Sequence, residues 1–235
     1  MGWENPAASR RQHMPTSRRT APPLTTKVQP AQQRATETFE RILDAAAKTL
    51  TEVGIERLST NLVCERAGLS PPALYRYFPN KYSLLAELGQ RLMQRQNDCI
   101  DRWISEDVLA GGVPAVEAAL VGLLLDTFAV TRRTEGGIWI MRALRAVPAL
   151  EEIRLNSHAQ VTEAQAQLLA RALPKAKLAE LRLASRIVVE LIYATVEMLF
   201  DESLDAKRVA AVTAGMMASH LEKLVPRKSA SPRRR

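Results

Sequence analysis

Apolar residues recur every three or four positions along most of the chain, which is the spacing that places side chains on one face of an α-helix. The first apolar stripe runs from Phe39 to Val53, and Gly54 follows it directly. No useful length of sequence alternates apolar and polar residues with the period of two that marks a half-buried strand. The chain is therefore predicted to be all-α.

Helix boundaries follow from the capping residues, glycines and prolines that flank the apolar stripes. Gly111-Gly112 and Pro114 mark a loop and a new helix start, and Pro148 and Pro174 stand at boundaries, as early-helix prolines should. The predicted helices cover approximately residues 36–53, 59–67, 73–78, 81–105, 114–131, 135–146, 149–171, 175–201 and 205–224.

The segment from Leu58 to Lys81 predicts two short helices joined by a tight turn. Ser59 and Thr60 are good N-cap types and stand directly before a short amphipathic run. Gly68 interrupts that run and can adopt the left-handed conformation that a tight turn needs. Ser70 is a second N-cap candidate, and the two prolines after it suit the first turn of the next helix.

This arrangement suits the major groove of DNA. The groove is about 12 Å wide and admits one helix, whose N-terminal residues meet base edges. Small residues at positions 70–73 would allow a close approach to the bases, while Leu69, Leu74 and Phe78 would hold the helix to its own domain. Residues 66–81 contain three basic residues and no acidic one. A helix-turn-helix that binds DNA is the resulting prediction.

About 45 of the 235 residues, from Arg41 to Leu85, resemble the DNA-binding domain of the TetR family of bacterial transcriptional regulators. The shared features are Ile42-Leu43-x-Ala45-Ala46, Gly54, Leu58-Ser59-Thr60, Ala67-Gly68-Leu69-Ser70, Leu74-Tyr75-x-Tyr77-Phe78 and Lys81-x-x-Leu84-Leu85. Two positions depart from the pattern: Cys64, where the family usually has Ala, and Asn61, where a basic or other polar residue is common. Asn61 bears on base readout, so the operator sequence stays open.

The resemblance implies which side chains meet DNA. Residues expected to approach bases are Ser70, Pro71, Pro72, Ala73 and Tyr75, with Arg76 reading a base or a phosphate. Residues expected to hold phosphates are Thr60, Tyr77 and Lys81, with Thr36 as a candidate at the start of the first helix. Ser59 and Asn61 complete the predicted DNA-binding set.

The resemblance also implies a second, helical domain over residues 84–225 that binds an effector and forms a homodimer through the last two long helices. A dimer would place two recognition helices about one DNA turn apart, which matches a palindromic operator. From the residues alone, the apolar stripes of those helices could instead pack inside one subunit. Candidate residues for an effector pocket are Trp103, Phe128, Trp139, Met141, Arg142, Tyr193 and Glu190, with His158 and Glu197 as further polar candidates.

The formal net charge of +8 comes from the two ends of the chain. Residues 1–33 carry a net +4 and residues 226–235 a net +5, which leaves −1 for residues 34–225. Residues 1–33 are predicted to be a disordered basic arm, residues 34–83 the helix-turn-helix domain, and residues 226–235 a disordered basic tail. The arm is read either as a DNA-backbone contact or as a solubilising segment.

Signatures of catalysis are absent, since the sequence has no G-x-S-x-G, no G-x-x-x-x-G-K-[ST] and no G-x-G-x-x-G. The three histidines do not stand at zinc-ligand spacing with either cysteine, so no metal or cofactor is expected. Two cysteines fit a reducing cytosol, and the longest uncharged run, Val209 to Leu221, is too short to span a bilayer. A soluble bacterial cytoplasmic protein, nucleoid-associated when bound to DNA, is expected.

The sequence thus predicts a TetR-like repressor that a small molecule releases from a palindromic operator. The alternatives that remain are a TetR-like activator, a helical ligand-binding module that does not touch DNA, and a nonspecific nucleic-acid binder driven by its basic ends.

Overall fold

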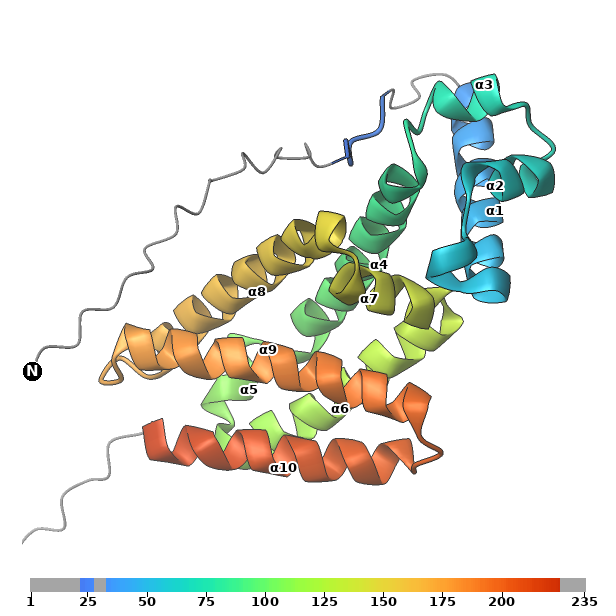
Figure 1. The fold of residues 1–235 in the computed structure, drawn as a ribbon. Helices are drawn as coiled ribbons and strands as arrows, with labels where there is room; N and C mark the ends of the chain where they lie inside the picture. Colours follow the sequence, from blue (N-terminus) through green and yellow to red (C-terminus); the bar gives the residue numbers. More distant parts are fainter. Residues whose placement is uncertain (1–21, 28–32, 225–235) are drawn as a thin grey trace, which may run out of the picture.

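The structure is a computed structural model that describes residues 22–27 and 33–224. The described residues form ten α-helices and one 3-10 turn and contain no strand, which confirms the all-α prediction. The elements are α1 (Gln33–Arg57), α2 (Thr60–Ala67), α3 (Pro71–Tyr75), α4 (Lys81–Trp103), α5 (Glu106–Ala110), α6 (Gly112–Arg133), α7 (Gly137–Ala146), η1 (Pro148–Leu150), α8 (Glu151–Ala172), α9 (Leu178–Asp201) and α10 (Ala206–Leu224). Helices α1–α3 lie at one end of the molecule, and α9 and α10 run side by side at the other (Figure 1).

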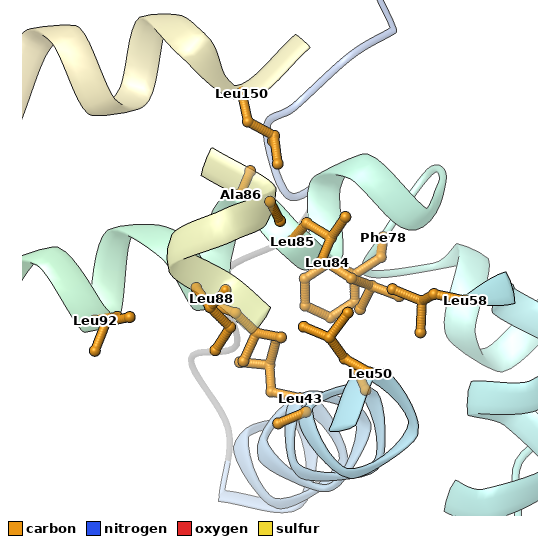
Figure 2. Close-up of a cluster of buried hydrophobic side chains, with 14 of the residues drawn as sticks. Leu43, Leu50, Leu58, Phe78, Leu84, Leu85, Ala86, Leu88, Leu92 and Leu150 are labelled. Carbon is orange, nitrogen blue, oxygen red and sulfur yellow. The ribbon is translucent and has the colours of Figure 1, made fainter. Parts of the chain in front are cut away.

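The small end of the molecule is built on the apolar face of α1. Leu43 and Leu50 of α1 meet Phe78 and Leu84, which lie on either side of the α3–α4 turn (Figure 2). All four side chains are buried, so α2, α3 and the start of α4 share one core with α1. That core fixes α3 against the rest of the molecule.

Helix α4 connects the two ends of the molecule. It contacts α1 at its start and then α6, α7 and α8 along its length. At Gly89 the backbone passes so close to α7 that an added Cβ would lie 2.7 Å from Leu144 Cδ2. The small end and the larger helical part therefore pack together through α4 and α7.

The larger part has a second core between α4, α6, α9 and α10. Cys99, Leu123, Ile192 and Ala214 are buried there. Helix α6 is long and apolar enough to cross a membrane by length and composition. In the structure it packs against α4, α9 and α10, as the core helix of a helical domain does.

The structure differs from the predicted boundaries by two or more residues at several helix ends, and it contains one helix that was not predicted. Helix α1 begins at Gln33 instead of near Thr36, and α3 ends at Tyr75 instead of Phe78. Helix α5 was not predicted, because its five residues are too few to show a helical period. Gly54, predicted to end the first helix, does leave the helical conformation with a φ of 73°.

Candidate nucleic-acid interface

Helix α2 is capped at both of its ends. The Ser59 side chain accepts a hydrogen bond from Leu62 N at 3.3 Å and so caps α2 at its N-terminus. At the other end, Gly68 N donates to Glu65 O at 3.2 Å and Leu69 N donates to Cys64 O at 3.0 Å. This Schellman arrangement needs the left-handed φ of 61° at Gly68, which glycine adopts without strain.

Helix α3 presents a short exposed surface above a buried anchor. Leu74 is fully buried, as predicted, and faces the α1 core, while Ser70, Pro71 and Pro72 are exposed and Ala73 is half-buried. Small, exposed residues at the start of a helix allow its end to approach a groove closely. The structure therefore brings together all four residues that were predicted to approach bases from the start of this helix.

Two hydroxyl groups join α2 to α3 at this surface. Thr60 Oγ1 and Tyr75 Oη lie 2.9 Å apart and share a hydrogen bond, and 40 % of Tyr75 is exposed. One hydroxyl of such a pair donates to the other, which leaves the second proton to point outward. The pair can therefore offer a donor to a phosphate oxygen or a base acceptor while it holds the two helices together.

Basic side chains flank this surface at residues 76 and 81. Arg76 is exposed, and its guanidinium lies 5.9 Å from the centroid of the Tyr77 ring. Lys81 Nζ donates to Leu58 O at 3.2 Å and lies 5.7 Å from the Tyr82 ring. Within the described residues neither cation has a carboxylate partner, so both charges remain available to a phosphate.

Tyr77 differs from the expectation of an exposed, polar-tipped contact. Only 5 % of the residue is exposed, and its ring packs edge-on against Phe39 with centroids 6.0 Å apart. The side chain is therefore mainly part of the core between α1 and α3. A phosphate contact through Tyr77 is limited to the small part of the residue that is exposed.

The remaining predicted residues sit around the same turn or at the start of α1. Asn61 is exposed on α2, one residue after Thr60. Thr36 is exposed on the first turns of α1. Cys64, on the buried face of α2, has a thiol whose pKa is raised by this burial, so the thiol stays protonated at neutral pH.

Residues 22–27 do not behave as part of a disordered arm. Asn80 Nδ2 donates to Pro23 O at 3.0 Å, Lys27 N donates to Tyr77 O at 2.9 Å, and Leu24 packs against the core. These contacts hold the segment against the α3–α4 turn. The other residues predicted to form the arm and the tail, 1–21, 28–32 and 226–235, lie outside the described residues, and residue 33 already belongs to α1.

The structure does not bring the seven predicted effector-pocket residues together. Trp103 is 37 % exposed and its Nε1 donates to Asp126 at 2.9 Å. Phe128 packs on Phe200, and Arg142 lies 5.2 Å above the Trp139 ring and forms an ion pair with Asp201. These three aromatic residues were expected to line a pocket, but in the structure they contact side chains of α6, α9 and α7 instead.

Met141, Tyr193 and Glu190 belong to a polar cluster around His158. His158 is buried, stacks on Tyr193 with ring centroids 4.6 Å apart, and has its Nδ1 3.1 Å from Glu190 Oε1. Burial lowers the pKa of His158, although the Glu190 carboxylate acts in the opposite direction. Met141 and Tyr193 line a small cavity of about 20 Å³ beside His158.

A much larger cavity, of about 300 Å³, lies between α4, α6, α8, α9 and α10. Leucine, isoleucine, valine and methionine form most of its wall, and none of the seven predicted residues lines it. Its volume is at the lower end of the range that small-molecule sites show. The sequence carried no separate signal for this cavity, because aliphatic residues on the same stripes also form the solid core.

No group of three or more His, Cys, Asp or Glu side chains among the described residues is placed to hold a metal ion. The geometry is that of a DNA-binding helix-turn-helix protein. It has a short, anchored recognition helix with exposed small residues, flanking hydroxyl groups and two cations that have no carboxylate partner among the described residues.

Comparisons with known proteins identify the family. Residues 42–88 match the family model described as bacterial regulatory proteins, tetR family. An uncharacterized HTH-type transcriptional regulator of Mycobacterium tuberculosis is 33 % identical over 147 residues, which cover 62 % of this chain and 72 % of that protein. The chain belongs to the TetR family, and it is a sequence-specific DNA-binding transcriptional regulator.

Further relatives match either a third of the chain or most of it. The transcriptional repressor KstR of Mycolicibacterium smegmatis is 38 % identical over 78 residues, which are 33 % of this chain and 36 % of KstR. A solved TetR-family regulator from Streptomyces coelicolor has a TM-score of 0.53 and 24 % identity and covers 80 % of this chain and 99 % of its own. The regulator FadR of Bacillus halodurans has a TM-score of 0.59 and 17 % identity, with 81 % and 97 % covered. Both structural likenesses show the fold alone.

Proposed function

We propose that the chain is a homodimeric repressor whose two α3 helices read a palindromic operator and which a small-molecule effector releases from DNA. The observation that carries the DNA-reading part is the exposed surface of α3, residues 70–76, fixed on the buried side chains of Leu74 and Phe78. Residues 34–83 would form the DNA-binding domain and residues 84–225 the effector-binding and dimerisation domain.

Repression is favoured over activation because KstR and a tetracycline repressor are among the relatives of this chain. TetR-family regulators are generally non-enzymatic, soluble and cytoplasmic, and they typically act as homodimers that respond to small molecules. For this chain we further propose that the operator-bound dimer is associated with the nucleoid.

The dimer proposal rests on exposed apolar residues of the last two helices. Leu183, Ile187 and Leu191 stand on one face of α9, and Val212 and Met216 stand on one face of α10. Between 40 % and 69 % of each residue is exposed. Apolar side chains that recur at helical spacing on two adjacent helices fit burial against a second copy. We call these five residues the α9–α10 face.

Release by an effector would act through α4. The 300 Å³ cavity is lined in part by α4 residues, and α4 begins at the helix-turn-helix. An effector that binds one orientation of α4 more tightly than the other shifts the dimer toward that orientation. The two α3 helices would then no longer match the spacing of the half-sites.

The test is binding of the purified chain to DNA that flanks its own gene, with excess nonspecific competitor at near-physiological salt. We expect Arg76→Ala to weaken this binding by about 1–3 kcal/mol, because it removes an exposed cation next to the groove-facing surface. Arg171→Ala is the matched control, because its exposed ion pair with Glu106 lies on α8, far from α3 (Figure 1).

Equal losses in Arg76→Ala and Arg171→Ala would indicate attraction by net charge alone. That outcome would favour the nonspecific binder driven by the basic ends of the chain. A complex that disappears when residues 1–21 and 226–235 are removed would lead to the same conclusion.

A further inference from the structure

The 300 Å³ cavity has an almost entirely aliphatic wall with a single buried hydroxyl in it. From this wall we infer that the cavity takes an uncharged, mainly hydrocarbon molecule with one hydrogen-bonding group, which Ser185 receives. This inference rests on the proposed function, in which the cavity binds the effector, and it specifies the effector's chemical class.

The wall excludes a charged ligand. Among the residues that line the cavity only three are polar, namely Gln165, Ser185 and His220, and none is Asp, Glu, Lys or Arg. A carboxylate or phosphate inside such a wall would lose its water without gaining a fixed counter-charge, which is strongly unfavourable. A hydrocarbon body gains by burial in the same place.

Ser185 supplies the polar contact. It is 4 % exposed and lies in the wall, and its Oγ has no hydrogen-bond partner in the structure. A buried hydroxyl without a partner is costly, so a ligand group that bonds to it is favoured over a methyl group in the same position. The hydroxyl both donates and accepts, so it can receive an alcohol, a ketone or an amide.

Ser185 Oγ is the one such atom in the wall of this cavity. The other buried polar side-chain atoms that lack a partner in the described residues lie on α4 and α8, and none of their residues lines the 300 Å³ cavity. They are Gln96 Oε1, Asn97 Oδ1, Arg154 Nε, His158 Nε2 and Thr162 Oγ1. The separate 20 Å³ cavity beside His158 is large enough for one water molecule. A polar group of a ligand in the larger cavity should therefore turn toward Ser185.

The mouth of the cavity opens on the α9–α10 face. Ile187, Leu191 and Met216 line the cavity and are also 50 %, 40 % and 69 % exposed. A second copy that packs on the α9–α10 face would cover these residues and close the mouth. The bound molecule would then be enclosed only in the dimer, which links effector binding directly to the geometry of the subunit interface.

The test compares 1-decanol with decanoate at pH 8, as competitors of the neutral fluorescent probe Nile red bound to the full chain. The two ligands share one hydrocarbon body and differ in the charge of the head group. We expect 1-decanol to bind at least tenfold more tightly than decanoate. Equal or tighter binding of decanoate overturns the inference, and so does failure of both Nile red and 1-decanol to bind.

Two variants test the site itself. Ser185→Ala should weaken 1-decanol binding about fivefold, the loss expected for one hydrogen bond. Ser219→Ala is the control, because its Oγ bonds to Met216 O on α10 and Ser219 does not line the cavity. Ala184→Leu adds a side chain to the cavity wall and should abolish binding, with thermal unfolding used to confirm that the variant is folded.

Operator binding, measured on the same preparations, separates the two proposals. Operator binding by wild type without any 1-decanol binding overturns the ligand class and leaves the repressor intact. Binding of 1-decanol without operator recognition supports the ligand class and overturns the proposed repressor. Leu183 lies on the α9–α10 face but does not line the cavity, so Leu183→Glu can separate the subunits without altering the wall. Should 1-decanol bind a monomeric Leu183→Glu variant but not the dimer, side chains of the second copy fill the cavity and the inference is wrong.

Discussion

Because Tyr77 is buried, the choice of substitution at this position determines whether packing or DNA contact is tested. Its ring is almost fully buried against Phe39, so Tyr77→Ala removes packing as well as a hydroxyl. We expect Tyr77→Ala to lower the free energy of unfolding by about 3 kcal/mol, the cost of deleting a buried aromatic ring. Tyr77→Phe should keep the stability within about 1 kcal/mol of wild type and change operator affinity by less than about threefold. Chemical denaturation and DNA titration of the two variants measure both quantities.

The paired result distinguishes packing from DNA contact at Tyr77. A large loss of affinity in Tyr77→Phe without loss of stability would assign a phosphate contact to the hydroxyl. For the turn and the exposed start of α3 the sequence was a better guide, because small residues, prolines and a left-handed glycine leave few conformations open. Tyr77 was harder to predict, since a tyrosine serves equally well as a surface contact or a core ring.

His158 makes stability depend on pH. Burial lowers its pKa in the folded chain, while Glu190 acts to raise it and the neighbouring Arg186 and Arg154 act to lower it. The unfolded chain therefore binds a proton at higher pH than the folded chain does. Stability contributed by neutral His158 is present above the unfolded pKa of about 6.5 and is lost as the pH falls from there toward the folded pKa.

We therefore expect the melting temperature of wild type to fall between pH 7.5 and pH 5.5, and to fall less in His158→Gln, which has no imidazole to protonate. Thermal unfolding of both proteins at a series of pH values tests this. An equal pH dependence in the two proteins would show that His158 is not the group responsible.

At the scale of elements, helices with long apolar stripes were predictable and short ones only where caps marked them. Helices α2 and α3 were found from Ser59, Gly68 and Ser70, whereas α5 has no comparable pattern within five residues. A homodimer through α9 and α10 was expected from the family resemblance and not from the residues alone, because one apolar stripe serves equally well inside a subunit or between two. In the structure part of each stripe is buried inside the subunit and part remains exposed.

The α9–α10 face gives the prediction at this scale. Met216→Glu should convert a dimer to a monomer, because the face would have to bury a carboxylate without a partner. Leu155→Glu is the matched control, since Leu155 is 41 % exposed on α8 outside that face. Light scattering after size-exclusion chromatography reports the mass of each variant. Dimers of unchanged stability in both variants would place the subunit interface elsewhere.

At the scale of the whole molecule, the position of the ligand cavity was the part that the sequence could not supply. Several residues that were predicted to line a pocket have other contacts instead. Trp103 donates a hydrogen bond to Asp126, and Arg142 lies over the Trp139 ring and forms an ion pair with Asp201. The cavity arises instead where aliphatic side chains of five long helices fail to meet. Whether such side chains touch depends on helix crossings, and those are set by the packing of the entire chain.

The arrangement of the molecule links three surfaces: the α3 end, the cavity and the α9–α10 face. Helix α4 begins at the first of these and lines the second, and the mouth of the cavity opens on the third. In the proposed repressor, α4 would therefore link DNA reading, ligand binding and dimer geometry. A dimer with two α3 helices requires that the preferred DNA sequence be a palindrome.

The most direct test of this account is selection of DNA from a random pool by the full chain, repeated with a chain that lacks residues 1–21 and 226–235. We predict that both proteins enrich the same palindrome, with half-sites about one helical turn apart, and that Arg76→Ala relaxes the preference at one position in each half-site. Enrichment without two-fold symmetry, or a preference that vanishes with the basic ends, would contradict the account.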